Sequence, residues 1–144
     1  MVLDIRAGSA ADAAEIRRVR RESWIAAYTG IIDRAAIDRA TAEPPPSRPA
    51  PDPPPDVRTL VAVGGDDPAV IGFASFGPER AVVSASYPAV PQAGGPTARV
   101  VLWVLADNAR ARRFYERAGF AHDGVTNILT GLGGVLELRY ARDL

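Results

Sequence analysis

Residues 2–7 alternate between apolar and polar side chains near the start of the chain, which predicts a short strand. The spacing of apolar residues then changes to that of a helix over 10–28, with arginines on the opposite side, so an amphipathic helix is expected there. Ser9 precedes this helix and Asp12 lies three residues further on, close to the pattern of a capping box. Gly30 is expected to end the helix.

The two sides of this predicted helix differ clearly in polarity. The mostly apolar side carries Ala13, Ile16, Val19, Arg20, Ser23, Trp24, Ala27 and Tyr28. The opposite side carries Arg17, Arg18, Arg21 and Glu22. Such a division predicts a surface helix that buries one side.

The middle of the chain contains a weaker helix pattern, a proline-rich run and a hairpin. The weaker helix is predicted for 33–43. The run 44–55 holds eight prolines in twelve residues, and proline cannot occupy the interior of a helix or sheet. Residues 44–56 are therefore expected to be a flexible excursion within one domain, with a ligand for a proline-recognising module as the alternative. Two β-prone segments, 58–63 and 69–77, flank a Gly-Asp turn and predict a hairpin.

The last third of the chain begins with two further strand patterns. Residues 81–87 form a candidate strand, and 99–106 is almost entirely apolar, as in a strand buried on both faces. A short helix follows, with Asp107 or Asn108 as its N-cap and Gly119 as its stop.

Two more strands, 124–131 and 134–144, are expected to close the chain around a glycine-rich turn. The order strand, two helices, hairpin, strands, helix, hairpin predicts a mixed domain of the α/β (α+β) class. The length of 144 residues fits a single domain over 1–144 with a substantial core.

Composition narrows the possible functions. The chain has no cysteine, which excludes disulfides, thiolate metal sites and cysteine nucleophiles. It has one histidine, His122, so neither a histidine metal site nor a serine triad is expected, and His122 is assigned no role. The formal net charge is zero, so neither nucleic acid nor membrane is an expected partner. The apolar runs are too short to span a bilayer and no signal peptide is recognisable, so a cytoplasmic location is expected.

The segment VLWVLADNARARRFYERAGF joins a strand, an Asn cap, a Phe-Tyr pair and a Gly-Phe stop. It resembles the closing signature of the GNAT superfamily of acyl-CoA-dependent N-acetyltransferases. The opening IRAGSAADAAEIRRVRRESWIAAYTGII, the TLVAV and VIGFASF hairpin and the final GGVLELRYARDL are similar to the same family in the same order. The resemblance implies a mostly antiparallel sheet flanked by helices. It also implies transfer of an acetyl group from acetyl-CoA to a small-molecule or peptide amine.

The chemistry of that family suggests roles for residues of the 99–120 region. In the family, a backbone N–H on the fourth strand polarises the thioester carbonyl while the amine attacks it, and a tyrosine on the helix after the fifth strand protonates the leaving thiolate. By resemblance this tyrosine is Tyr115, and Leu102, Val104 and Asn108 are contacts of the acetyl-CoA. The alternative role for Tyr115 is a core aromatic, and for Asn108 a plain N-cap.

The same resemblance places Trp24 and Tyr28 at the pocket of the acceptor amine, with helix packing as the alternative. Glu22 is a candidate base in this region, but its position opposite the side of Trp24 argues against that role.

The pyrophosphate loop of the family is the part this chain matches least well. In such a loop, exposed amides at the start of a long helix bind the anion. Gln92 and Gly95 fit the pattern and are predicted cofactor contacts, whereas Thr97 replaces a small residue and Pro96 removes an amide. An ordinary Gly-Pro turn is the alternative. No helix of ordinary length fits between this loop and the next strand, so 78–98 is expected to be a shortened region that lacks the central cofactor-binding helix.

This departure leaves two functions open. One is a GNAT-like N-acetyltransferase that uses acetyl-CoA, and the other is a catalytically inactive, truncated GNAT-like binding or structural domain. The missing helix is also expected to expose one face of strand 99–106, which a partner subunit, a relocated segment of the chain or a homodimer would cover.

Overall fold

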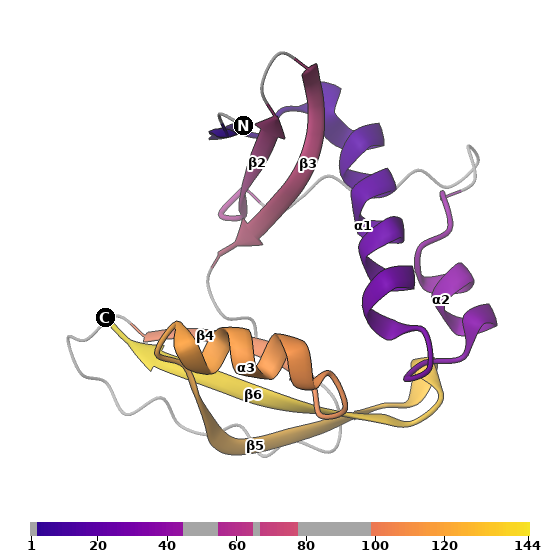
Figure 1. Ribbon diagram of the computed structural model, residues 1–144, viewed down its shortest axis with the longest axis vertical. Helices are drawn as coiled ribbons and strands as arrows, with labels where there is room; N and C mark the ends of the chain where they lie inside the picture. Colours follow the sequence, from indigo (N-terminus) through magenta and orange to yellow (C-terminus); the bar gives the residue numbers. More distant parts are fainter. Residues whose placement is uncertain (1–2, 45–54, 65–66, 78–98) are drawn as a thin grey trace. The chain divides into compact units, whose positions relative to one another are not determined.

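The computed structural model describes residues 3–44, 55–64, 67–77 and 99–144 (Figure 1). It is an α+β structure with antiparallel sheets and three α-helices in the described residues, as the sequence predicted. The chain divides into two compact units, Met1–Pro78 and Glu79–Leu144, which are described separately below.

The first unit contains a three-stranded antiparallel sheet in the order β1-β2-β3. Its strands are β1 (Leu3–Ala7), β2 (Arg58–Gly64) and β3 (Asp67–Phe76). The predicted first strand and the predicted hairpin are therefore confirmed. The register between β2 and β3 shifts near Val63, so that part of the hairpin contains a β-bulge.

Helix α1 (Ala13–Tyr28) follows a short 3-10 turn, Ala10–Asp12, and confirms the predicted amphipathic helix. The Ser9 N–H donates a hydrogen bond to Asp12 Oδ2 at 2.7 Å, which is the contact that the capping-box pattern predicted. Gly30 has φ +87°, a left-handed conformation that glycine adopts without strain, and the helix ends just before it.

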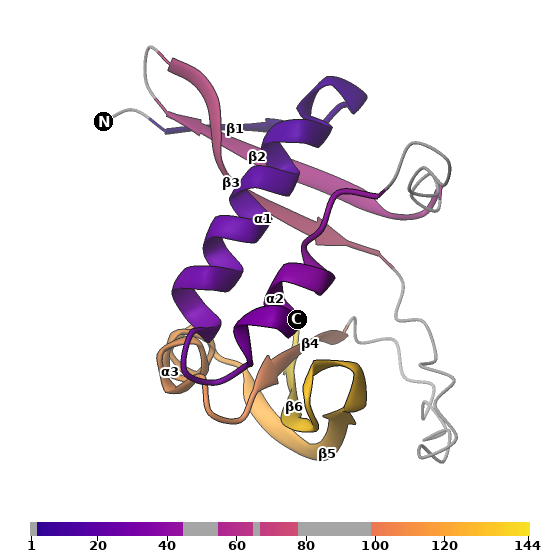
Figure 2. The same cartoon turned by 90° about the vertical axis from the view of Figure 1, so that its right-hand side faces the viewer.

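Helix α2 (Arg34–Ala40) lies beside α1 (Figure 2) and confirms the weaker helix, although it is shorter than predicted. Ile37 on α2 and Ile32 just before this helix are both buried.

Helix α1 covers one face of the first sheet. Val19 on the helix packs with Val61 and Val70 on the sheet, and Ile16 and Phe73 border this core. The opposite face of the sheet is largely uncovered. The large apolar side chains exposed there are Leu3, Ile5, Leu60 and Phe76.

The second unit contains another antiparallel sheet, in the order β4-β6-β5, with helix α3 against it (Figure 1). Its elements are β4 (Arg99–Leu105), α3 (Ala109–Arg117), β5 (Ala121–Leu129) and β6 (Val135–Asp143). All four were predicted, with differences in their bounds.

The core of the second unit lies between α3 and the sheet. It consists of Val104, Leu138 and Tyr140, and Ala111 and Tyr115 on α3 pack against them. These α3 residues are four positions apart, so both lie on one side of the helix.

Two predictions for this unit need correction. Val104 and Leu105 are buried on opposite sides of β4, but Arg99 and Val100 are exposed, so the strand is not buried along its whole length. Strand β5 begins at Ala121, earlier than predicted, because the left-handed Gly124 (φ +92°) lies within an irregularity of the strand instead of starting it.

Several predictions lie outside the described residues. They concern the excursion 44–56, most of which is not described, the strand 81–87, and the absence of a helix within 78–98. The predicted phosphate-loop contacts Gln92 and Gly95 also lie outside.

No helix in the described part of the chain is both long enough and apolar enough to span a membrane. Within the same residues, no cluster of three or more His, Asp or Glu side chains could hold a metal ion.

Candidate active site

A groove runs along the first unit between α1 and β3. Its volume is about 320 Å³, which lies at the small end of the range for small-molecule pockets. Helix α1 contributes Val19, Arg20, Ser23, Trp24, Ala27 and Tyr28 to its lining, and β3 contributes Ile71, Gly72 and Phe73. The α1 residues all belong to the side of the helix that the sequence identified as mostly apolar. Trp24 and Tyr28, the predicted acceptor contacts, both line this groove.

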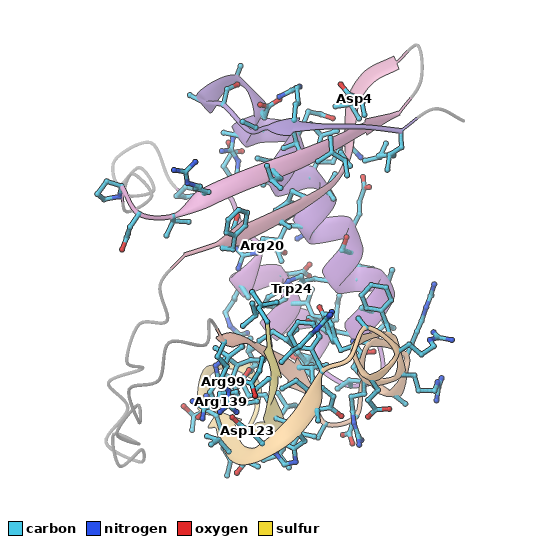
Figure 3. All side chains as sticks on the ribbon, turned by 90° about the vertical axis from the view of Figure 1, so that its left-hand side faces the viewer. Asp4, Arg20, Trp24, Arg99, Asp123 and Arg139 are labelled. Carbon is cyan, nitrogen blue, oxygen red and sulfur yellow. The ribbon has the colours of Figure 1, made fainter. Side chains whose placement is uncertain are left out.

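Arg20, Trp24 and Tyr28 are spaced four residues apart on α1, so their side chains form a continuous strip along the groove. The Arg20 guanidinium carbon lies 5.3 Å from the centroid of the Trp24 ring, a distance typical of a cation–π contact. The rings of Trp24 and Tyr28 meet edge to face, with 5.2 Å between centroids and 70° between planes. These contacts restrain the three side chains along the wall of the groove. Figure 3 labels Arg20 and Trp24 on this helix.

The opposite side of α1 carries charges that neutralise one another. Arg18 pairs with Glu15 at 2.8 Å and with Glu22 at 3.0 Å. Glu22 is not among the described residues that line the groove, and its carboxylate is already paired with Arg18. The geometry therefore agrees with the sequence argument against Glu22 as a base.

Tyr115 lies half-buried on the inner side of α3. Its ring packs against the core of the second unit and meets Phe120 edge to face, with 6.0 Å between centroids. No hydrogen bond joins its hydroxyl to any residue that the structure describes. The ring therefore has a packing role, while its hydroxyl has no structural partner there.

Asn108 is the N-cap of α3. Its side-chain oxygen accepts a hydrogen bond from the Ala111 N–H at 3.1 Å, which satisfies one of the free donors at the start of the helix. The N-cap role is thus confirmed, and a contact with acetyl-CoA stays a prediction.

Leu102 and Val104 lie on the side of β4 that faces α3, and both belong to the core with Tyr115. The Ala106 N–H donates to Leu136 O on the β6 side at 2.9 Å. Alternate residues of a strand direct their amides to the same edge, so the amides of Leu102 and Val104 also point toward β6. Their contact with acetyl-CoA is likewise a prediction.

A partly buried polar network beside this core was not predicted from the sequence. The Tyr140 side chain is buried, and its hydroxyl donates to Glu116 Oε1 at 2.8 Å and accepts from Arg112 Nε at 3.1 Å. The hydrogen bond to Tyr140 raises the pKa of Arg112 above its ordinary value. Arg112 also donates to the Ala106 carbonyl at 3.0 Å and so ties α3 to the loop that precedes it. The spacing of Arg112 and Glu116, four residues apart on α3, is a signal that could have suggested such a network.

A second polar cluster stabilises the irregular part of β5. The Asp123 carboxylate accepts from Arg139 at 2.8 Å, from Arg99 at 3.2 Å and from the Val125 N–H at 3.1 Å. Figure 3 labels the three charged residues together at one end of the second unit. His122, which was assigned no role, is exposed and stacks on the Tyr140 ring.

The structure thus brings the predicted residues together in two sets. Trp24 and Tyr28 meet in the first unit, and Leu102, Val104 and Tyr115 share the core of the second. Sequence reasoning placed Arg20 on the side of α1 with Trp24 but gave it no role. As the charged member of that mostly apolar side, it carried a signal that could have marked it.

Solved structures of N-acetyltransferases resemble the chain over nearly its full length. A PaiA N-acetyltransferase of Thermoplasma acidophilum, solved in complex with coenzyme A, aligns with a TM-score of 0.64 and 19% identity. The alignment covers 96% of this chain and 98% of that one. A GCN5-related N-acetyltransferase from Kribbella flavida aligns with a TM-score of 0.53 and 20% identity, over 99% of this chain and 98% of that one.

Sequence comparisons add no closer relative. No model of a known protein family matches the chain, and no curated protein matches it. The likeness is therefore one of three-dimensional structure, and it confirms the fold that the sequence signature predicted. The chain has the fold of the GNAT N-acetyltransferases.

Proposed function

We propose that this protein is an N-acetyltransferase that transfers the acetyl group of acetyl-CoA to an amine. A fold alone does not fix a function, so the proposal depends on a particular group in the site. That group is the Tyr115 hydroxyl. Tyr140, in the same core, has both a donor and an acceptor contact at its hydroxyl, whereas the Tyr115 hydroxyl has no partner among the described residues. A half-buried phenol without a structural partner is available to transfer a proton.

The proposed reaction forms one bond and breaks another. The lone pair of the neutral amine attacks the thioester carbonyl carbon, and a tetrahedral intermediate forms. The N–C bond remains, the C–S bond breaks, and the sulfur leaves with the bonding electrons. Tyr115 donates its proton to this thiolate, the amine nitrogen loses a proton to water, and Tyr115 is then reprotonated from solvent. The products are the acetylated amine and free CoA thiol.

The described residues also offer a fit for the pantetheine arm of the co-substrate. Since the amides of Leu102 and Val104 point toward β6, those of Val101 and Leu105 point toward the other edge of β4. A pantetheine amide is able to pair with backbone groups at such an edge, as a strand does. The similar N-acetyltransferase structure solved with coenzyme A is a second observation that supports acetyl-CoA as the co-substrate. Gln92 and Gly95 stay the predicted contacts of the pyrophosphate.

A second candidate function is a non-catalytic GNAT-like domain. One sequence observation favours it: Pro96 removes an amide from the predicted phosphate loop. The N-cap hydrogen bond of Asn108 is also a structural role that needs no catalysis.

The proposed function is tested by following CoA thiol release and amine acetylation together. The protein is incubated with acetyl-CoA and a panel of amines, and free thiol is measured while mass spectrometry detects the added acetyl group. An acetyltransferase produces both in equal amounts and only with an amine present. Absence of any acetylated amine across primary amines of different charge contradicts the proposal and favours the non-catalytic domain.

A further inference from the structure

We propose that the groove between α1 and β3 binds an acceptor amine that also carries a carboxylate, an amino acid with an apolar or aromatic side chain, and that Arg20 recognises the carboxylate. This inference rests on the proposed function for the transfer of acetyl to the amine. The recognition itself is a property of the groove and is measurable without acetyl-CoA.

The first argument is the ion pairing of the arginines on α1. Three of them have carboxylate partners on α1 itself, on α2 or in the segment that follows α2. Arg17 pairs with Glu43 at 3.4 Å, Arg18 with Glu15 and Glu22, and Arg21 with Asp38 at 2.8 Å. Arg20 differs from these three. Among the described residues it has no carboxylate within ion-pair distance, and its guanidinium lies over the Trp24 ring.

The second argument is the composition of the groove. Its described lining contains no Asp or Glu, so Arg20 gives it an uncompensated positive charge. A polyamine would meet like-charge repulsion there and would find no described carboxylate to bind its second cation. A carboxylate, in contrast, accepts two parallel hydrogen bonds from a guanidinium, which gives both affinity and orientation.

The third argument is the position of the guanidinium. Its stacking on Trp24 restrains the Arg20 side chain along the groove wall, so less conformational freedom is lost when a carboxylate binds. Apart from Ser23, the remaining wall is apolar or aromatic and includes Tyr28 and Phe73. A ligand with a carboxylate at one end and an apolar body therefore matches the wall better than a small hydrophilic amine.

The test compares L-phenylalanine with phenethylamine, which has the same ring and amine but no carboxylate. Spermidine represents the polyamines. Binding to the full chain without acetyl-CoA is followed by isothermal titration, and by Trp24 fluorescence in a Trp103→Phe background that leaves one tryptophan. We expect phenylalanine to bind about tenfold or more tightly than phenethylamine, as a charge-assisted bidentate contact implies.

Variants at two arginines then separate recognition from general charge. Arg20→Gln is expected to remove the preference for phenylalanine, and Arg20→Lys, which keeps the charge without the planar fork, is expected to reduce it. Arg17→Gln removes the same charge from a residue of α1 that pairs with Glu43 and does not line the groove, and it is expected to leave the preference unchanged. A melting curve confirms that each variant is folded.

Equal affinity for the matched pair, tighter binding of spermidine, no binding of any probe, or an Arg20→Gln variant that keeps the preference overturns the proposal. Its failure is distinguishable from that of the proposed function. Acetylation of phenethylamine or spermidine as fast as of phenylalanine contradicts the assignment of Arg20 while it supports an acetyltransferase. Carboxylate-dependent binding with no acetyl transfer leaves the assignment of Arg20 and contradicts the acetyltransferase.

Discussion

Tyr115 and Tyr140 pack in the same core of the second unit but differ at their hydroxyl groups. Tyr115→Phe removes a hydroxyl with no described partner, so we expect the melting temperature to stay within experimental error. If Tyr115 is the general acid, acetyl transfer falls by about 100-fold or more. Thermal melts and thiol-release rates on the same samples check both parts. A variant with unchanged rate would assign Tyr115 to packing alone.

Tyr140→Phe is the matched substitution, and unlike Tyr115→Phe it is expected to lower stability. It leaves Arg112 and Glu116 without their shared partner, so the free energy of unfolding is expected to fall by about 1 to 3 kcal/mol. Urea unfolding measures this loss. An undiminished free energy of unfolding would show that the network contributes nothing net to stability.

Asp12 predicts a particular dependence of stability on pH. Hydrogen bonds from Arg6, at 2.7 Å and 3.0 Å, and from Ser9 hold the pKa of its carboxyl well below its usual range. A carboxyl with a depressed pKa stabilises the fold above its unfolded pKa of about 4, and this contribution is lost as the pH falls toward the folded pKa. Asp12→Asn is therefore expected to be less stable than the natural chain at neutral pH.

The difference between the two chains is expected to shrink as the pH falls below about 4, because the natural chain loses the contribution there and the variant does not have it. Urea unfolding at a series of pH values checks this. Curves that stay parallel from neutral to acid pH contradict the role assigned to Asp12.

At this scale the sequence predicted some contacts and missed others for a physical reason. Ser9, Asp12 and Asn108 act through neighbours in the chain, so local spacing was enough to predict them. Tyr140, which bonds to Arg112, and Arg139, which pairs with Asp123, lie on β6, far away in the sequence. Only the packing of α3 on the sheet and the sheet register bring these pairs together.

At the scale of an element, the end of helix α3 is also set by contacts between neighbours in the chain. It ends in a Schellman motif, in which the Phe120 N–H bonds to Tyr115 O and the Gly119 N–H to Glu116 O, both at 3.0 Å. Gly119 has φ +86°, which the sequence pattern anticipated by placing the stop there. The motif also explains why Tyr115 and Phe120 are in contact.

Gly119→Ala is expected to lower the free energy of unfolding by about 1 kcal/mol, because alanine is strained at a positive φ. Gly131→Ala is the control, since Gly131 has no positive φ and nothing within 4 Å of an added methyl group. Equal effects of the two substitutions in urea unfolding would contradict the assigned motif.

Asn108 has a predicted role in the helix and another in the site, and two substitutions separate them. Asn108→Ala removes the cap and is expected to cost about 1 kcal/mol of stability, whereas Asn108→Asp keeps an oxygen acceptor and most of the stability. If the amide also contacts acetyl-CoA, Asn108→Asp weakens acetyl-CoA binding while the melting temperature changes little. Unaltered binding by this variant would leave Asn108 as a cap only.

At the scale of the whole molecule, element order and the 101–120 signature were enough to predict the fold, which the structural comparisons confirm. The groove was harder to predict. Its α1 wall follows from helical periodicity, but its β3 wall depends on how α1 packs on the sheet. The position of Arg20 in the groove depends on the same packing. The exposed apolar face of the first sheet was likewise not predicted. The homodimer expected to cover strand 99–106 stays a prediction, which light scattering in solution would test.

The most direct test of the account is titration of the protein with acetyl-CoA, because the sequence departs from the family at the element that would bind its pyrophosphate. We expect saturable heat with one site per chain, together with a rise in melting temperature as the concentration of acetyl-CoA increases. No heat and no rise in melting temperature at millimolar acetyl-CoA would contradict the account and leave a GNAT fold without its co-substrate.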